Sequence, residues 1–338
     1  MSCYQPHSML VTGGAGFIGS NFIRYVLTNQ PEINIINLDK LTYAGSLDNL
    51  KNLPHAERHH FVQGDICDAK LVRHLLHHHH VDTIVHFAAE SHVDRSITSP
   101  QSFVETNVLG TFTLLEAARH HWIEVENNPR EHCRFHHIST DEVYGSLMPQ
   151  DPAFTETTAY QPRSPYSATK AGSDHLVHAY HHTYGLPVTI SNCSNNYGLY
   201  QHPEKFIPTI IRSCLTSQPI PVYGTGKNIR DWLYVDDHCS AVMTILKDGV
   251  IGETYNIGGN NEWENLKLVQ YICELIDKKI PQNKPCTSLI SFVNDRPGHD
   301  FRYAIDDSKL RKKLHWQPRE SMASGLDKTI TAIAAALA

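Results

Sequence analysis

Short apolar runs alternate with longer amphipathic segments through the first 194 residues of the chain. The short runs are rich in β-branched residues, as buried strands are, and the longer segments carry the apolar spacing of helices. The pattern predicts strands at 9–12, 34–39, 60–63, 83–87, 134–138 and 188–193, and helices at 17–29, 70–78, 100–121 and 165–184. This alternation indicates an α/β fold with a doubly wound parallel sheet of the Rossmann type.

The alternation breaks down after Asn195. Prolines at 203, 208, 219 and 221 indicate short strands and irregular connections, and residues 283–300 are again loop-like. We expect residues 1–194 to form the Rossmann domain. Residues 195–338 should form most of a smaller, discontinuous substrate domain, with a segment near 232–262 returning to the first. Ligands of open α/β folds bind at the carboxyl edge of the sheet, so the smaller domain should lie there.

Composition narrows the functional class. Among the 338 residues, 41% are hydrophobic and 19% charged, and the formal net charge is −6, which does not suggest a partner in nucleic acid or at a membrane surface. No apolar run approaches the roughly 20 residues that span a bilayer, and the N-terminus lacks the pattern of a signal peptide. We therefore expect a cytoplasmic protein.

Cysteine and histidine give no sign of a metal site. The eight cysteines are scattered without a C-x-x-C pair, which is typical of reduced thiols. The 24 histidines include a run at 77–80. Adjacent residues near a helix end point in different directions, so we interpret the run as solvated surface and expect no metal.

A glycine pattern follows the first predicted strand. Gly13, Gly16 and Gly19 stand between a strand and a helix, where small residues let the backbone approach a pyrophosphate. A tight turn without a ligand is the alternative. Asp39 ends the second strand, 20 residues after Gly19, where a carboxylate binds the adenosine ribose hydroxyls. These features predict NAD rather than NADP, although the adjacent Lys40 points weakly the other way.

The candidate chemistry lies in two short segments. Tyr166 and Lys170 are four residues apart, so both lie on one helix face, and an ammonium near a phenol should favour the phenolate. That pair suffices for a dehydrogenase or an epimerase. Thr140, Asp141 and Glu142 add a hydroxyl and two carboxyls, which elimination of water requires as acid and base. Neighbouring side chains point oppositely in a strand, so both acids should follow the end of the fifth strand.

Five motifs in order carry a resemblance that spans about residues 8–320. They are Ser-Thr-Asp-Glu-Val-Tyr-Gly at 139–145, Tyr-Ser-Ala-Thr-Lys at 166–170, Asn-Asn-Tyr-Gly at 195–198, Arg-Asp-Trp-Leu-Tyr-Val at 230–235 and Asp-Arg-Pro-Gly-His-Asp at 295–300. The chain resembles extended short-chain dehydrogenase/reductases, and among them the 4,6-dehydratases that act on dTDP-glucose. The resemblance implies NAD-dependent C4 oxidation by Tyr166, elimination of water by Glu142 and Asp141, and hydride return to C6.

The resemblance also implies site residues. For NAD they are Gly13, Gly16, Phe17, Ile18, Gly19, Asp39, Lys40, Leu41, Thr42, Asp65, Ile66, Ala88, Ala89, Glu90, Thr106, Tyr166, Lys170 and Asn196. A helix N-cap is an equally good interpretation of Asp65. For the nucleotide sugar they are Ser91, Thr140, Asn195, Glu204, Lys205, Phe206, Pro221, Val222, Tyr223, Arg230, Asn265, Arg296 and His299. Phe206 and Val222 depart from the family's usual Leu and Ile, which leaves thymine against uracil open.

Several alternatives remain from the sequence. A nucleotide-sugar 4-epimerase, a decarboxylase or a UDP-glucose 4,6-dehydratase shares most of these motifs, a GDP-mannose dehydratase fits less well, and a non-catalytic NAD-sensing protein would need only the Rossmann part. The segments 100–121 and 165–184 resemble paired helices through which relatives form homodimers by a four-helix contact. Covering of those helices within the monomer is the alternative.

Overall fold

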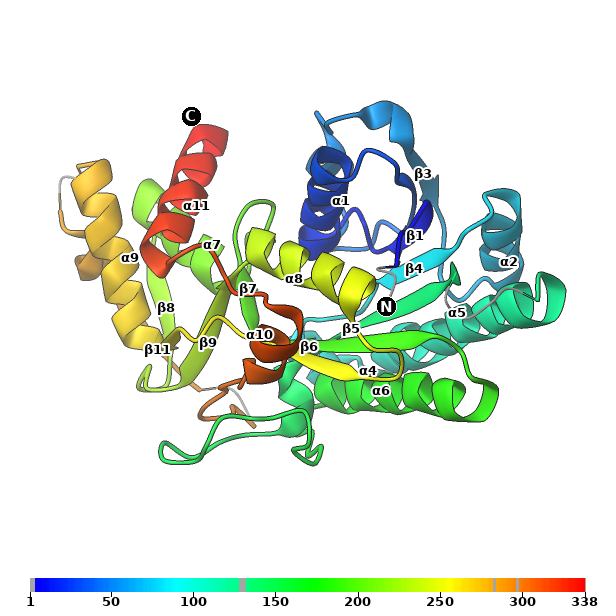
Figure 1. Cartoon of the computed structure of the whole chain (residues 1–338). Coiled ribbons are helices and arrows are strands. Elements are labelled where there is room, and N and C mark those ends of the chain that lie inside the picture. The colour runs from blue at the N-terminus through cyan, green and yellow to red at the C-terminus, as the bar shows by residue number, and fades with distance from the viewer. Residues whose placement is uncertain (1–3, 128–131, 282–283, 296–297, 338) are drawn as a thin grey trace.

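A seven-stranded sheet organises the larger part of the molecule (Figure 1). The computed structural model describes residues 4–127, 132–281, 284–295 and 298–337. The strands are β1 (Ser8–Thr12), β2 (Asn34–Asp39), β3 (His59–Gln63), β4 (Thr83–His86), β5 (Arg134–Thr140), β6 (Val188–Cys193) and β10 (Thr254–Ile257). Their order is β10-β6-β5-β4-β1-β2-β3, with every neighbouring pair parallel. The predicted Rossmann fold is confirmed.

Helices cover both faces of this sheet. They are α1 (Phe17–Asn29), α2 (Ala69–His78), α3 (Val93–Thr98), α4 (Pro100–Phe103), α5 (Thr111–Ala118), α6 (Pro165–Tyr184) and α8 (Val235–Asp248). Helices α1 and α8 pack together over one face, and α2, α5 and α6 over the other (Figure 1). Each face therefore encloses its own apolar core, and the strands between are buried on both sides, as parallel strands usually are.

A smaller lobe contains two short sheets. Its strands are β7 (Asn195–Tyr197), β8 (Ile220–Tyr223), β9 (Ile229–Tyr234), β11 (Glu262–Glu264) and β12 (Ile290–Val293). They form the orders β11-β9-β7 and β12-β8. The helices α7 (Phe206–Thr216), α9 (Asn265–Lys279) and α11 (Met322–Leu337) pack against them around a third core. A short helix, α10 (Ser308–Leu314), packs on β10 of the large sheet.

The chain passes between the two lobes more than once. Within the segment 232–262, which we expected to return to the Rossmann part, α8 and β10 lie on the large sheet. Its first residues belong to β9 and its last residue to β11, both in the small lobe. The small lobe is therefore assembled from segments on either side of α8 and β10.

Most predicted elements agree with the structure within one residue. The fifth strand extends two residues further, to Thr140. The predicted helix at 100–121 is a continuous helical segment in which α4 and α5 alternate with the π-helical stretches η3 (Val104–Gly110) and η4 (Arg119–Val125). The remaining short helices are the 3-10 turns η1 (Leu47–Leu50), η2 (Ala56–Arg58), η6 (Asp141–Tyr144) and η7 (Cys286–Leu289).

The start of α6 is fixed by its own sequence. Ser164 accepts a hydrogen bond from the Ser167 backbone N–H, and the Ser167 hydroxyl bonds back to the Ser164 backbone, which is a capping box. Pro165 occupies the first turn, and Gly185 ends the helix with a φ of 71°. Because Tyr166 stands in that first turn, the cap also fixes the position of its side chain.

We expect Ser164→Ala to lower the free energy of unfolding by about 1 kcal/mol, because the cap loses its acceptor. Ser164→Asp, which supplies another good N-cap acceptor, should remain close to the wild-type protein. Urea unfolding of the three proteins, followed by circular dichroism, measures the difference. Equal midpoints for the Ala and Asp variants would contradict the capping argument.

Candidate active site

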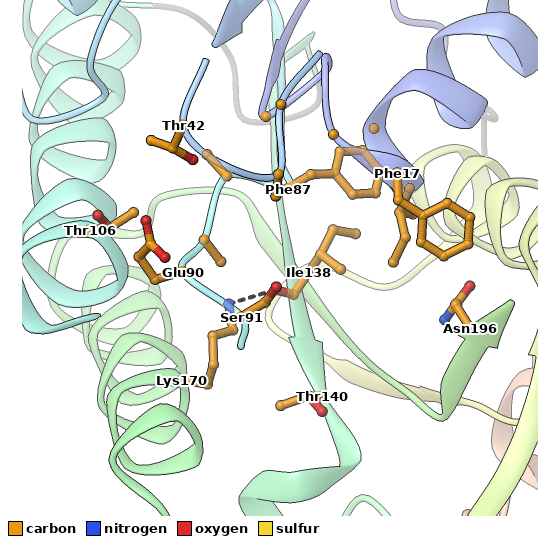
Figure 2. Close-up of a pocket in the computed structure, with 18 of the residues that line it drawn as sticks. Phe17, Thr42, Phe87, Glu90, Ser91, Thr106, Ile138, Thr140, Lys170 and Asn196 are labelled. Atoms are coloured by element: carbon orange, nitrogen blue, oxygen red, sulfur yellow. Dashed lines mark hydrogen bonds between the residues drawn. The ribbon is translucent and has the colours of Figure 1, made fainter. Parts of the chain in front are cut away.

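A cavity of about 320 Å³ opens where β1, β4, β5 and β6 end (Figure 2). The carboxyl ends of parallel strands meet at one edge, so the residues that follow each strand converge there. Every residue predicted to hold NAD lines this cavity except Leu41. All five predicted catalytic residues line it as well. The structure thus brings the two predicted sets together in one space.

The glycine turn between β1 and α1 permits close approach to a ligand. Gly13 has a φ of +72°, and a Cβ there would lie 2.7 Å from the backbone of Ala88. A Cβ on Gly19 would lie 2.3 Å from the Gly13 carbonyl oxygen. Helix α1 begins at Phe17 without a side-chain cap. This end of a helix suits a phosphate group, because uncapped N–H groups and the helix dipole both favour an anion.

Asp39 ends β2 at the edge of the cavity. Its Oδ2 accepts from the Ala15 backbone N–H at 2.9 Å and its Oδ1 from the Leu41 N–H at 2.8 Å. Burial raises the pKa of this carboxyl, while the two N–H donors lower it. Asp39 therefore fixes the glycine turn as well as its own turn, in which Leu41 has a φ of 57°.

Lys40 and Asp65 form an ion pair at 2.7 Å. Asp65 also accepts from the Cys67 N–H at 2.9 Å, whereas the N-cap of α2 is Asp68. The N-cap interpretation of Asp65 is therefore wrong. The Lys40 ammonium is engaged by a carboxylate of the protein, which weakens it as a signal for a 2′-phosphate.

Strand β5 ends at Thr140, and the chain then turns through η6. Thr140 is the N-cap of this turn and accepts from the Glu142 N–H at 3.3 Å. Because the strand has ended, the adjacent Asp141 and Glu142 both line the cavity, as the sequence predicts. Asp141 is 2% exposed, and burial followed by the nearby Glu142 charge raises its pKa well above 3.8. Asp141 is thus kept as a neutral acid near neutral pH.

Tyr166 and Lys170 line the cavity from α6, but they are not bonded in the way we expected. The Lys170 Nζ donates to the Ile138 carbonyl of β5 at 2.7 Å (Figure 2). Burial, followed by the Glu142 charge, raises the pKa of Tyr166 well above 10, and a hydrogen bond with Thr140 opposes this. The expected lowering of the phenol pKa is absent, because the lysine side chain extends past the phenol to the strand.

The predicted nucleotide-sugar residues divide into two groups. Ser91, Thr140, Asn195 and Lys205 line the cavity, and the Lys205 Nζ donates to the Ser91 carbonyl at 3.4 Å. The residues that lie beyond the cavity lining are Glu204, Phe206, Pro221, Val222, Tyr223, Arg230, Asn265 and His299. Arg296 lies outside the described residues.

The outer group lies in the small lobe. On β8, Pro221 and Tyr223 are exposed, whereas Val222 is 1% exposed and packs in the core. The Val222 side chain therefore faces away from its two neighbours, since strand residues alternate. Tyr223 and His299 are in edge-to-face contact, with ring centroids 6.3 Å apart.

Phe206 begins α7 and stacks on Trp232 at 6.0 Å. Asn265 begins α9, and Glu204 pairs with Arg95 of the large lobe at 3.4 Å. These positions surround the small-lobe side of the molecule rather than the dinucleotide cavity.

Arg230 is 6% exposed and anchors the segment that follows the small lobe's loops. Its guanidinium donates to the Ile229 carbonyl at 2.7 Å and to the Asp300 carbonyl at 3.0 Å. It also lies over the Tyr303 ring at 4.3 Å. Its positive charge lowers the pKa of Asp141 and so opposes the effect of burial there.

The sequence did not indicate several cavity residues. These are Leu38, Ala44, Gly45, Gly64, Phe87, Ile138, Ser139, Cys193, Ser194, Gln201 and His202. Most of them end a strand of the large sheet or stand in the first residues after it. That position was the available signal, because it does not depend on side-chain chemistry.

The histidine run at 77–80 ends α2 and the turn after it. His77, His78 and His80 are exposed, and His79 is half-buried. Among the described residues, no group of three His, Cys, Asp or Glu side chains could hold a metal ion. In the same described part of the chain, none of the helices has the length and apolar character needed to cross a membrane.

We expect Gly13→Ala to weaken NAD binding at least about tenfold. A left-handed φ costs an L-residue roughly 1–2 kcal/mol before the clash with Ala88, and 1.4 kcal/mol is a factor of ten. Gly172→Ala on α6 is the control, since its Cβ would have only ordinary contact, at 3.8 Å from Val108. Calorimetric titration of the stripped proteins with NAD measures both. Unchanged affinity in Gly13→Ala would contradict the close approach.

We expect Asp141→Asn to be more stable than the wild type at neutral pH. A carboxyl whose folded pKa exceeds its unfolded value of 3.8 costs stability that grows as pH rises from that value to the folded pKa. The difference in melting temperature, variant minus wild type, should therefore increase from about pH 5 to about pH 8 by roughly 1–3 °C. A difference that is constant with pH would show that Asp141 is not held neutral.

Comparison with known proteins places the chain in a family. The profile described as "GDP-mannose 4,6 dehydratase" matches residues 10–329. A dTDP-glucose 4,6-dehydratase of Shigella flexneri is 52% identical over 330 residues, which cover 95% of this chain and 91% of the relative. The crystal structure of DesIV, a dTDP-glucose 4,6-dehydratase from Streptomyces venezuelae with NAD and TYD bound, has a TM-score of 0.88 and 45% identity, with 97% of each chain covered.

An epimerase fold is also similar, at a greater distance. The UDP-glucose 4-epimerase of Thermotoga maritima has a TM-score of 0.84 but only 26% identity, over 98% of this chain and 100% of that one. The higher identity thus lies with relatives that are named as dehydratases. From the profile match and these identities, the chain belongs to the GDP-mannose 4,6 dehydratase family and, within it, is similar to the dTDP-glucose 4,6-dehydratases.

Proposed function

We propose that the protein is an NAD-dependent hydro-lyase that converts dTDP-glucose to dTDP-4-keto-6-deoxyglucose. The observation that carries this proposal is the position of Asp141 and Glu142, which share one cavity with Tyr166 and Lys170. An epimerase returns a hydride to the carbon that lost it and needs no acid and base for water. The relatives that are named as dTDP-glucose 4,6-dehydratases support the same reaction.

The residues around the glycine turn fit NAD. Gly13 and Gly19 leave no room for a side chain, and Asp39 ends β2 beside them. At the other end of the cavity, Asn196 has a buried Oδ1 without a hydrogen-bond partner. When bound, NAD accepts the hydride from the sugar and returns it, and its positive ring favours the phenolate of Tyr166. Since NAD is regenerated in each turnover, the protein should retain it.

The first proposed step is oxidation at C4. Tyr166 takes the proton of the 4-hydroxyl, and Thr140 shares a hydrogen bond with the phenol. A charged Lys170 behind the phenol stabilises the phenolate that this step needs. Burial makes Tyr166 a strong proton acceptor once it is ionised, because it raises the pKa of the phenol.

The second proposed step is elimination of water across C5 and C6. The 4-ketone acidifies the C5 hydrogen, which Glu142 removes as a base. Asp141 gives its proton to the departing 6-hydroxyl. The environments of the two acids fit this division, since Asp141 is buried and its pKa is raised, whereas Glu142 is only partly buried. Hydride return to C6 then gives the 6-deoxy sugar.

For the substrate, we assign Ser91 and Thr140 to the hexose, and Asn195 and Lys205 to the phosphate side. The outer group in the small lobe (Glu204, Phe206, Pro221, Val222, Tyr223, Arg230, Asn265, Arg296 and His299) is assigned to the nucleotide. Tyr223 is 42% exposed beside His299, which leaves a ring face free for a base. The Val222 side chain is turned into the core, so it can shape a base pocket only from behind.

We further propose a cytoplasmic homodimer. Val104, Leu109 and Phe112 are each more than 40% exposed along the helical segment that packs against α6. Exposed apolar side chains on paired helices suit a four-helix contact between two copies. A cytoplasmic location agrees with the free thiols of the seven described cysteines.

The test of the function uses dTDP-glucose in deuterated water, with no NAD added. We expect dTDP-4-keto-6-deoxyglucose that carries deuterium at C5, as measured by NMR and mass spectrometry. Formation of UDP-galactose from UDP-glucose in a parallel reaction, with no product from dTDP-glucose, would replace the proposal with an epimerase.

Two variants separate the roles of the acids. Asp141→Asn should form little product, yet the dTDP-glucose recovered from it should gain deuterium at C5, because oxidation and proton exchange by Glu142 continue. Glu142→Gln should form neither product nor labelled substrate. We expect product formation to fall at least about 100-fold in both, the range for loss of a general acid or base. Labelled substrate from Glu142→Gln would assign the base elsewhere.

A further inference from the structure

A set of buried polar side chains lies behind Lys170, between α6 and the large sheet. Asp174 is one helical turn after Lys170, and its side chain is fully buried. His137, on β5, is fully buried beside it. Neither side chain lines the active-site cavity. A carboxyl group at such a position needs partners, because burial of an unpaired charge is costly.

The partners of Asp174 come from three segments. Its Oδ2 accepts from the Ser139 hydroxyl at 2.7 Å and from the Tyr160 hydroxyl at 3.0 Å. Its Oδ1 lies 3.2 Å from His137 Nε2. The same ring nitrogen lies 3.3 Å from the Lys170 Nζ. One imidazole nitrogen therefore stands between the lysine ammonium and the aspartate carboxylate.

We infer that Asp174 is the buried counter-ion of Lys170, which it reaches across His137, and that it keeps Lys170 charged for the oxidation step. The inference rests on the proposed function in one respect, namely that the oxidation step needs a charged Lys170. Asp174 does not touch the cavity, so it is a positioning residue that acts through Lys170.

The groups around Lys170 leave Asp174 as its source of negative charge. Burial lowers the pKa of Lys170 to about 8, and the Asp174 charge is the largest effect that opposes it. Burial keeps the other described titratable groups there neutral near pH 7: Tyr166 of α6, His86 of β4, His137 of β5 and Cys193 of β6, whose pKa is about 12. His178, also on α6, has a pKa lowered by burial.

Asp174 itself is held as a carboxylate by its neighbours. Burial raises its pKa to about 6, while Lys170 and the Ser139 and Tyr160 hydroxyls oppose that rise. At neutral pH the carboxylate is therefore ionised and the ammonium is protonated. Both remain charged in a region without water because each stabilises the other.

A purely structural role is the rival explanation. Tyr160 belongs to the loop that leads to α6, and Asn192 donates to its hydroxyl at 3.1 Å. Asp174 could simply tie this loop to β5. Loss of such a tie would lower activity at every pH, whereas loss of a counter-ion changes the pH at which Lys170 loses its proton.

The experiment uses Asp174→Asn, which keeps the shape of the side chain and removes its charge. Without the carboxylate, the pKa of Lys170 should fall from about 8 by one unit or more. The loss of kcat/KM for dTDP-glucose on the alkaline side should move to lower pH by the same amount. The activity of the variant relative to wild type should therefore be about tenfold lower at pH 8 than at pH 6. A relative activity that is independent of pH would overturn the inference.

A direct titration of Lys170 removes the dependence on turnover. NMR of lysine-labelled holoenzyme, with Lys170 assigned from Lys170→Arg, reports the pKa of its ammonium without substrate. We expect a lower pKa in Asp174→Asn, and Tyr160→Phe is the matched control. That control removes one hydrogen bond to Asp174 but leaves the charge, so Lys170 should titrate as in wild type. Equal Lys170 pKa values in wild type and Asp174→Asn would overturn the inference even if the dehydratase reaction is observed.

Wild-type protein supplies a further check if Asp174→Asn does not fold. The Lys170 signal should then show a second, smaller step near pH 6, as Asp174 takes up its proton. Absence of that step would show that the two groups are not coupled. Failure of the wild type to act on dTDP-glucose would reject the proposed function and leave the titration result standing.

Discussion

Exclusion of water at the carboxyl edge of the large sheet is the constraint on which the site depends. The same desolvation has opposite effects on acids and bases, since it always disfavours the charged form. It raises the pKa values of Asp141 and Tyr166 and lowers that of Lys170. Each group therefore starts from a protonation state that solvent would not give it. Small local contacts, such as the Thr140 hydroxyl, then decide how far each departs from its ordinary behaviour.

The fold creates this edge through one strand and one helix. β5 supplies Thr140 and, where it stops, Asp141 and Glu142, while α6 supplies Tyr166 and Lys170. The two elements pack directly on each other, so the acids and the phenol are fixed by backbone geometry rather than by long loops. The capping box at Ser164 extends that rigidity to the first turn of α6.

Much of the dinucleotide site could be predicted from the sequence, because it depends on local rules. Glycine in a strand–turn–helix and Asp39 at a strand end have few interpretations. The rest depends on contacts between segments far apart in the chain. The sequence could not show that Lys170 bonds to Ile138, that Asp65 pairs with Lys40, or that Val222 faces the core. The first of these reverses the expected effect on the Tyr166 phenol, since spacing along a helix does not fix where a long side chain ends.

The repeated passage of the chain between lobes has a consequence for how the protein can be divided. A fragment that ends at residue 194 would contain the expected Rossmann elements but lack β10 and α8. Strand β6 would then present unpaired backbone groups along a fully buried, apolar strand, and α1 would lose the helix that packs on it. Such edges recruit other chains. The two lobes are therefore one inheritable unit, and recombination between relatives should preserve function best where crossovers keep β6, α8 and β10 from the same parent.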